Sequence, residues 1–137
     1  MVPAAAAPCR RGTLTGEVTH VRDGDTIEVR GIPIRLSGVA APERGERGGA
    51  EARAVMRGLV AGRSVHCRLD GSRTHDRCAG VCYLDGADIA AELVRRGLAR
   101  DCPRYSGGRY AAAERAAARA GATIGAAYRL PGYCRRR

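Results

Sequence analysis

Two aspartates, an arginine and a glutamate follow one another closely near the start of the chain, in types and spacing that suit phosphodiester chemistry. Asp23 and Asp25 occupy an Asp-Gly-Asp turn. Arg35 and Glu43 follow on a second extended segment. Carboxylate oxygens suit hard cations such as Ca²⁺, and the planar fork of an arginine pairs with phosphate oxygens. The set favours metal-assisted attack on a phosphodiester, although an isolated Asp-Gly-Asp sequence is usually an ordinary hairpin turn.

The charge of the chain favours the same class of ligand. The net charge of the 137-residue chain is +10, and its 24 basic residues are all arginines. A GC-rich coding bias would explain the choice of arginine over lysine, but it does not explain the excess of positive charge. Nucleic acid is therefore favoured as the partner over an acidic protein or a membrane surface.

The length fits one domain, and the hydrophobic pattern predicts an α+β fold. Residues 1–12 are expected to form a flexible N-terminal arm, and residues 13–137 a single domain. Alternating hydrophobic residues predict strands at 13–21, 26–29, 32–36, 65–69 and 80–84. Helical spacing predicts about three α-helices, at 50–60, 89–98 and 110–120, with loops at 38–49 and 101–108. This arrangement is typical of a five-stranded OB-type β-barrel.

The chain contains six cysteines, whose disulfides would stabilise a small hydrophobic core that contains no Phe or Trp. Cys67 and Cys82 fall on core-facing positions of two strands that we expect to be neighbours, so a bridge between them is feasible. Cys102 and Cys134 flank the last expected helix, and a bridge there would hold the tail. The other two cysteines have no assigned pairing. Disulfides would indicate an oxidising compartment, so we expect a secreted or periplasmic protein, although the first residues do not resemble a signal peptide.

The ordered set of motifs resembles the staphylococcal nuclease (thermonuclease) family. The matching pieces are Asp23-Gly24-Asp25-Thr26, Arg35-Leu36, Ala41-Pro42-Glu43, Arg77, Tyr83-Leu84-Asp85-Gly86 and the segment from Glu92 to Ala99. Their order and spacing agree with the family over most of the chain. The Asp-Gly-Asp turn alone would be weak evidence, but the whole set in order is specific.

The resemblance implies an OB-type, nuclease-like domain and a calcium-dependent phosphodiesterase that acts on DNA and RNA. Asp25 would be a direct ligand of Ca²⁺, and Asp23 would support the metal through water. Arg35 and Arg77 would bind the scissile phosphate and stabilise its developing charge. Glu43 would orient or deprotonate the attacking water.

Other positions make the resemblance incomplete. Ala40 stands where the family usually has a second metal-binding aspartate. We therefore expect a weakened calcium site, which Ala40→Asp should tighten. His75-Asp76 replaces the usual Tyr-Gly before the second arginine. Tyr105 falls near the position of a tyrosine that contacts the bound nucleotide, although packing explains it equally well.

Three functions remain open. The first is a metal-dependent nuclease acting on single-stranded DNA or RNA, as a monomer without a membrane or a small-molecule cofactor. The second is a catalytically weak or inactive OB-fold module that only binds nucleic acid, for which Ala40 is the best argument. The third is a disulfide-stapled interaction domain, which predicts no salt-dependent binding to DNA.

Overall fold

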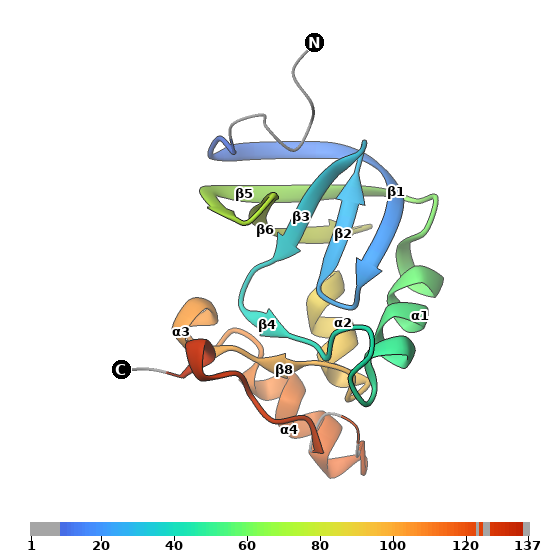
Figure 1. The fold of residues 1–137 in the computed structure, drawn as a ribbon, viewed down its shortest axis with the longest axis vertical. Coiled ribbons are helices and arrows are strands. Elements are labelled where there is room, and N and C mark those ends of the chain that lie inside the picture. The colour runs from blue at the N-terminus through green and yellow to red at the C-terminus, as the bar shows by residue number, and fades with distance from the viewer. Residues whose placement is uncertain (1–8, 123, 125–126, 136–137) are drawn as a thin grey trace.

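Five strands that close on themselves form the centre of the fold (Figure 1). They pair in the order β3-β2-β1-β5-β6, with bounds β1 Gly12–Asp23, β2 Thr26–Val29, β3 Ile32–Leu36, β5 Ser64–Thr74 and β6 Arg77–Leu84. β3 and β6 also pair with each other, in parallel, which joins the two ends of this run. The computed structural model describes residues 9–122, 124 and 127–135. The α+β fold predicted from the sequence is confirmed, and the closed five-stranded ring is the arrangement of an OB-type barrel.

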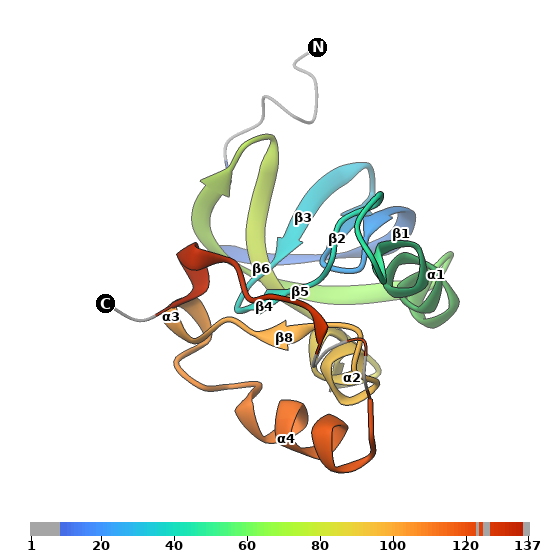
Figure 2. The same ribbon diagram turned by 60° about the horizontal axis from the view of Figure 1, so that its bottom comes forward.

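Helices and two short strand pairings surround one end of this ring. The described residues contain four α-helices, α1 Gly49–Val60, α2 Ile89–Arg95, α3 Pro103–Ser106 and α4 Ala111–Arg119, and the 3₁₀-helix η2 Gly132–Cys134. β7 (Ala87–Asp88) pairs antiparallel with the end of β6, while β4 (Val39–Ala40) pairs with β8 (Arg100–Asp101) beyond the ring. Figures 1 and 2 show that α4 lies on the far side of β8 and α2 from the ring, whereas the last part of the chain runs back past β8 toward the ring. None of the described helices has the length and hydrophobicity of a membrane-spanning helix.

The core lies between the inner face of the strands and the apolar faces of α1 and α2. α1 buries Ala52, Met56 and Val60, which recur every four residues and so share one face. α2 contributes Leu93, which is fully buried, and its N-terminus is capped by Asp88 through the backbone N–H groups of Ala90 and Ala91. These contacts pack both helices against the open end of the ring.

Most predicted elements are confirmed, and three predictions need correction. The predicted loop at 38–49 contains β4, because Val39 and Ala40 pair with β8, and a two-residue strand is too short to show alternation in the sequence. The predicted loop at 101–108 contains α3, because Pro103 occupies the first helical position, where its fixed φ favours a helix. The polar loop expected before Gly80 is instead the end of a long hairpin, since β5 continues to Thr74 and β6 begins at Arg77. This part of the hairpin extends beyond the core, so its strands lack the hydrophobic alternation on which the prediction depended.

Three disulfides link the described cysteines, and none of these cysteines is free. The predicted bridges Cys67–Cys82 and Cys102–Cys134 are confirmed. The remaining pair is Cys9–Cys78, which attaches the chain ahead of β1 to β6. The first eight residues of the expected arm lie outside the described residues. Three disulfides in a chain of this size indicate an oxidising environment.

Tyr110 provides a polar contact within the helical layer. It is 1% exposed, and its hydroxyl donates a hydrogen bond to the carboxylate of Asp88 at 2.8 Å. Burial, and then this contact with Asp88, raise the pKa of Tyr110 well above its ordinary value. The phenol therefore remains protonated in the folded protein at pH values where it ionises in the unfolded chain.

Stability is expected to fall in alkaline solution for this reason. The contribution of the neutral phenol is fully present below pH ~10, the ordinary pKa of tyrosine, and is lost as the pH rises above it. Tyr110→Phe should lose ~1.5 kcal/mol of unfolding free energy at pH 7 and show a smaller alkaline loss than the wild type. Urea unfolding at pH 7 and pH 10.5 measures both effects, with the exposed Tyr105→Phe as control. An equal alkaline loss in both variants would contradict this role of Tyr110.

Candidate active site

The six residues singled out in the sequence line one open groove of about 970 Å³. They are Asp23, Asp25, Arg35, Glu43, Arg77 and Tyr105. The groove lies between the β1–β2 turn, the adjoining ends of β3, β5 and β6, and residues 128–135, which we call the C-terminal segment. The structure therefore brings together every residue of the predicted site, although their chemical roles remain a prediction.

The carboxylate of Asp25 is the most buried acid of the groove, with 6% of the residue exposed. Its Oδ2 accepts a hydrogen bond from the backbone N–H of Ala41 at 3.0 Å and lies 3.4 Å from a guanidinium nitrogen of Arg35. Its Oδ1 accepts a hydrogen bond from the hydroxyl of Thr26 at 3.3 Å. A buried carboxylate costs stability unless it is paired, so these contacts hold three segments of chain at one point.

Gly24 allows the turn that carries Asp23 and Asp25 to pack directly against α1 and α2. A Cβ at this position would lie 2.9 Å from the Cβ of Ala52 on α1 and 3.1 Å from Leu93 on α2. Both distances are too short for a side chain to be accommodated without movement, so a glycine is required for this close approach. The two aspartates are thus positioned by α1 and α2 as well as by the strands that flank them.

Arg35 and Arg77 project from neighbouring strands onto the same face of the sheet. Arg35 lies opposite Ala79 in the β3–β6 pairing, and Arg77 precedes Ala79 by two residues. Side chains alternate along a strand, so both arginines lie on one face. Arg77 donates hydrogen bonds to the hydroxyl of Thr26 at 3.3 Å and to that of Thr74 at 3.2 Å. These contacts orient its guanidinium beside the Asp25 turn.

The β5–β6 hairpin that carries Arg77 is attached to β1 by an ion pair. Asp76 accepts hydrogen bonds from two guanidinium nitrogens of Arg22, at 3.0 and 2.8 Å. Hydrogen bonding from Arg22 lowers the pKa of Asp76 below its ordinary value. Because Arg22 directly precedes Asp23, this pair fixes the position of Arg77 relative to the acidic turn.

Glu43 belongs to a loop whose backbone is fixed and whose carboxylate is accessible. The Glu43 N–H donates to the carboxylate of Glu46 at 2.7 Å, and the Glu46 N–H donates to the Glu43 carbonyl at 3.0 Å. Gly49 packs against that carbonyl so closely that an added Cβ would collide with it. The Glu43 side chain is exposed and has no hydrogen-bond partner among the described residues. Its carboxylate is therefore accessible from the groove.

The acids that line the groove are the residues that could hold a hard cation. Asp25 and Asp23 lie on the turn, and Glu43 and Glu46 line the same groove. Among the described residues, however, no three or more His, Cys, Asp or Glu side chains are grouped closely enough to hold a metal. Ca²⁺ takes 6–8 oxygen ligands. The residues fit such an ion only if water or phosphate oxygens complete most of its coordination.

Ala40 has a structural role that the sequence did not reveal. It is fully buried in a small apolar cluster with Cys102, Cys134, Tyr128 and Leu130. An aspartate here would place its carboxylate against the disulfide and the C-terminal segment. The expectation that Ala40→Asp tightens calcium binding stays a prediction, but the apolar groups around this position mean that the substitution should also cost stability.

The C-terminal segment forms one wall of the groove, and the sequence analysis missed it. Cys134 is bonded to Cys102, and Arg100 donates a hydrogen bond to the backbone carbonyl of Tyr128 at 3.3 Å. Burial raises the pKa of the Tyr128 hydroxyl well above its ordinary value. The segment lines the groove with Tyr128, Arg129, Leu130, Pro131, Gly132, Tyr133 and Arg135. The expected Cys102–Cys134 bridge was the available signal, because it places this segment near Tyr105.

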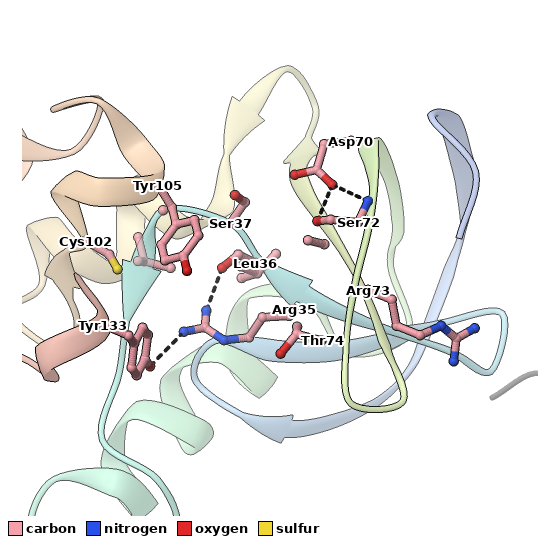
Figure 3. Close-up of a pocket in the computed structure, with 13 residues that line it drawn as sticks. Arg35, Leu36, Ser37, Asp70, Ser72, Arg73, Thr74, Cys102, Tyr105 and Tyr133 are labelled. Atoms are coloured by element: carbon pink, nitrogen blue, oxygen red, sulfur yellow. Dashed lines mark hydrogen bonds between the residues drawn. The ribbon is translucent and has the colours of Figure 1, made fainter. Parts of the chain in front are cut away.

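A second, smaller hollow of about 370 Å³ adjoins the groove at Arg35 (Figure 3). Arg35, Thr74, Tyr105 and Tyr133 line both. Figure 3 shows the guanidinium of Arg35 extending toward the Tyr133 ring, while a second nitrogen donates to the carbonyl of Leu36 at 2.6 Å. The arginine thus stands where the two spaces meet.

Comparison with curated proteins shows three informative similarities. The chain is 35% identical over 116 residues to the succinoglycan biosynthesis protein ExoI of Rhizobium meliloti, covering 76% of this chain and 61% of that protein. It is 36% identical over 96 residues to an uncharacterized endonuclease of Escherichia coli O157:H7, covering 66% and 63%. It is 28% identical over 103 residues to an uncharacterized endonuclease of Haemophilus influenzae, covering 72% and 58%.

These matches concern the domain and not the whole of each relative, because the chain spans about three fifths of their length. The family model described as "Staphylococcal nuclease homologue" matches residues 33–124. This range includes Arg35, Glu43, Arg77 and Tyr105, and it ends before the C-terminal segment. Because this family model matches more than half of the chain, and the strands form the closed ring described above, the chain belongs to the staphylococcal nuclease family.

Proposed function

We propose that this protein is a metal-dependent nuclease that hydrolyses phosphodiester bonds of DNA or RNA with little sequence specificity. The observation that carries the proposal is the convergence of Arg35, Arg77 and Asp25 on one groove, beside the accessible carboxylate of Glu43. The family match and the similarity to two proteins named as endonucleases support it. A net charge of +10 suits a polyanionic substrate.

The two arginines bind the non-bridging oxygens of the scissile phosphate in this proposal. Charge on those oxygens changes as water attacks the phosphorus atom, and donors already fixed in position stabilise the transition state without reorganising. Glu43 accepts the proton of the attacking water, which its accessible carboxylate can reach from the open side of the groove. As the new bond between this oxygen and phosphorus forms, the bond from phosphorus to one bridging ester oxygen breaks, and that oxygen leaves as an alcohol after taking a proton from solvent. Tyr105 contacts the nucleotide next to the scissile bond.

Asp25 is the proposed direct ligand of the metal, and Asp23 acts through water. A bound Ca²⁺ would supply positive charge that polarises a phosphoryl oxygen. The all-oxygen donor set fits this ion, but a site with few carboxylates binds it weakly. We therefore expect low calcium affinity in the free protein and higher affinity when substrate phosphate is present.

A binding module without catalysis is the second candidate, and Ala40 favours it. The position of a family metal ligand is occupied by a methyl group within an apolar cluster. Such a protein would retain the arginine-rich groove and would bind nucleic acid with strong salt dependence, but it would not cleave it.

The disulfides bear on the cellular compartment, and the origin of the site residues bears on the oligomeric state. We propose a secreted or periplasmic protein, since three disulfides need an oxidising compartment to form. We also propose that it acts as a monomer, because one chain supplies every residue of the proposed mechanism.

Replacing Arg77 tests the nuclease directly. Arg77→Ala should lower the rate of calcium-dependent cleavage of a fluorescent single-stranded oligonucleotide ~100- to 1000-fold, because one fixed donor to the phosphate is lost. The matched control is Arg57→Ala, which removes the same charge from an exposed position on α1 outside the groove. A comparable loss in both variants, or none in Arg77→Ala, would contradict the assigned role.

Introducing the family aspartate tests the role of Ala40. Ala40→Asp should lower the unfolding free energy in chelator by at least ~2 kcal/mol, because a polar group would be buried without a partner. Calcium should restore part of that loss by binding the folded state. Thermal unfolding with chelator and with 10 mM calcium measures both, and unchanged stability in chelator would contradict the buried apolar role.

A further inference from the structure

Tyr105 and Tyr133 are the large hydrophobic side chains that the described part of the chain leaves exposed. They are 57% and 50% exposed, respectively. Both line the groove and the adjoining hollow, beside Arg35. Figure 3 shows their rings at the same end of the hollow, with Arg35 extending toward Tyr133. Two exposed aromatic rings gathered at one rim indicate a binding surface.

One disulfide positions both rings. Cys102 immediately precedes α3, and its carbonyl accepts a hydrogen bond from the backbone N–H of Tyr105 at 3.0 Å. Cys134 directly follows Tyr133 in η2 and is fully buried. The Cys102–Cys134 bridge therefore joins the two elements that present the rings. Arg35 adds a contact at 3.5 Å between its Nη2 and the Tyr133 hydroxyl.

We propose that the C-terminal segment is the second wall of the nucleic-acid groove and that Tyr133 stacks on an unpaired base of a single strand. This inference rests on the proposed function and names its substrate class. Aromatic rings stack on any base, which suits binding without sequence preference. Arg129 and Arg135 on the same segment line the groove and supply positive charge for the backbone phosphates. A duplex keeps its bases stacked on one another and offers no free base face to Tyr133.

Binding without cleavage provides the test. The affinity of a fluorescein-labelled octathymidylate is measured by fluorescence anisotropy in chelator, and that of a labelled, blunt-ended, GC-rich duplex of two separate strands is measured alongside it. Tyr133→Ala should weaken octathymidylate binding ~10- to 100-fold and duplex binding less than about twofold. Tyr133→Phe, which keeps the ring, should bind octathymidylate as the wild type does. Circular dichroism confirms that each variant is folded.

Three results would overturn the inference. They are unchanged octathymidylate affinity in Tyr133→Ala, an equal loss for the duplex, or a loss in Tyr133→Phe as large as in Tyr133→Ala. The last would mean that the hydroxyl and its contact with Arg35 matter and that the ring does not. Absence of cleavage by the wild-type protein would instead contradict the proposed nuclease and leave this binding test decisive.

The disulfide is tested by Cys102→Ser combined with Cys134→Ser. Both tyrosines remain in this variant, but the covalent link between their elements is lost, so octathymidylate affinity should fall at least as far as in Tyr133→Ala. Wild-type affinity in the folded double variant would contradict the positioning role of the bridge.

Discussion

The buried carboxylate of Asp25 is the interaction on which the rest of the site depends. A charge with so little exposure requires partners, and it finds them in Thr26, in the backbone N–H of Ala41 and in Arg35. Thr26 is the first residue of β2, Ala41 lies in the loop that follows β4, and Arg35 lies on β3. The contacts of this one acid thus bring together the acidic turn, the loop that continues to Glu43, and Arg35, the first of the two arginines proposed to bind phosphate. The same contacts that stabilise the fold therefore also assemble the groove.

The C-terminal segment is held at the groove by apolar packing and a disulfide instead of by the carboxylate of Asp25. Its apolar side chains and Cys134 cover Ala40, so the position of the missing family aspartate is filled by packing. The same segment lines the groove with Arg129, Arg135 and Tyr133. The packing that surrounds Ala40 therefore also places positive charge and an aromatic ring along the groove.

The sequence was sufficient for the parts of the molecule that local patterns determine. Alternation located β2 and β3, helical spacing located α1, and core-facing cysteines on neighbouring strands predicted the Cys67–Cys82 bridge. The pairing of Cys9 with Cys78 was not predictable, because the chain ahead of β1 has no periodic pattern. The groove wall around Tyr133 was missed although its link to Cys102, 32 residues earlier in the chain, was predicted, because the segment has no periodic pattern that would show which side chains face the site.

The most direct measurement of the central claim is cleavage of single-stranded DNA and RNA with calcium, with magnesium and with chelator, in the wild type and in Glu43→Ala. The account predicts metal-dependent cleavage by the wild type that is lost in the variant, while both proteins bind an oligonucleotide. Glu43 is exposed and contributes no side-chain hydrogen bond among the described residues, so its replacement should leave the fold intact. Tight, salt-sensitive binding without cleavage by the wild type would contradict the account and identify a binding module.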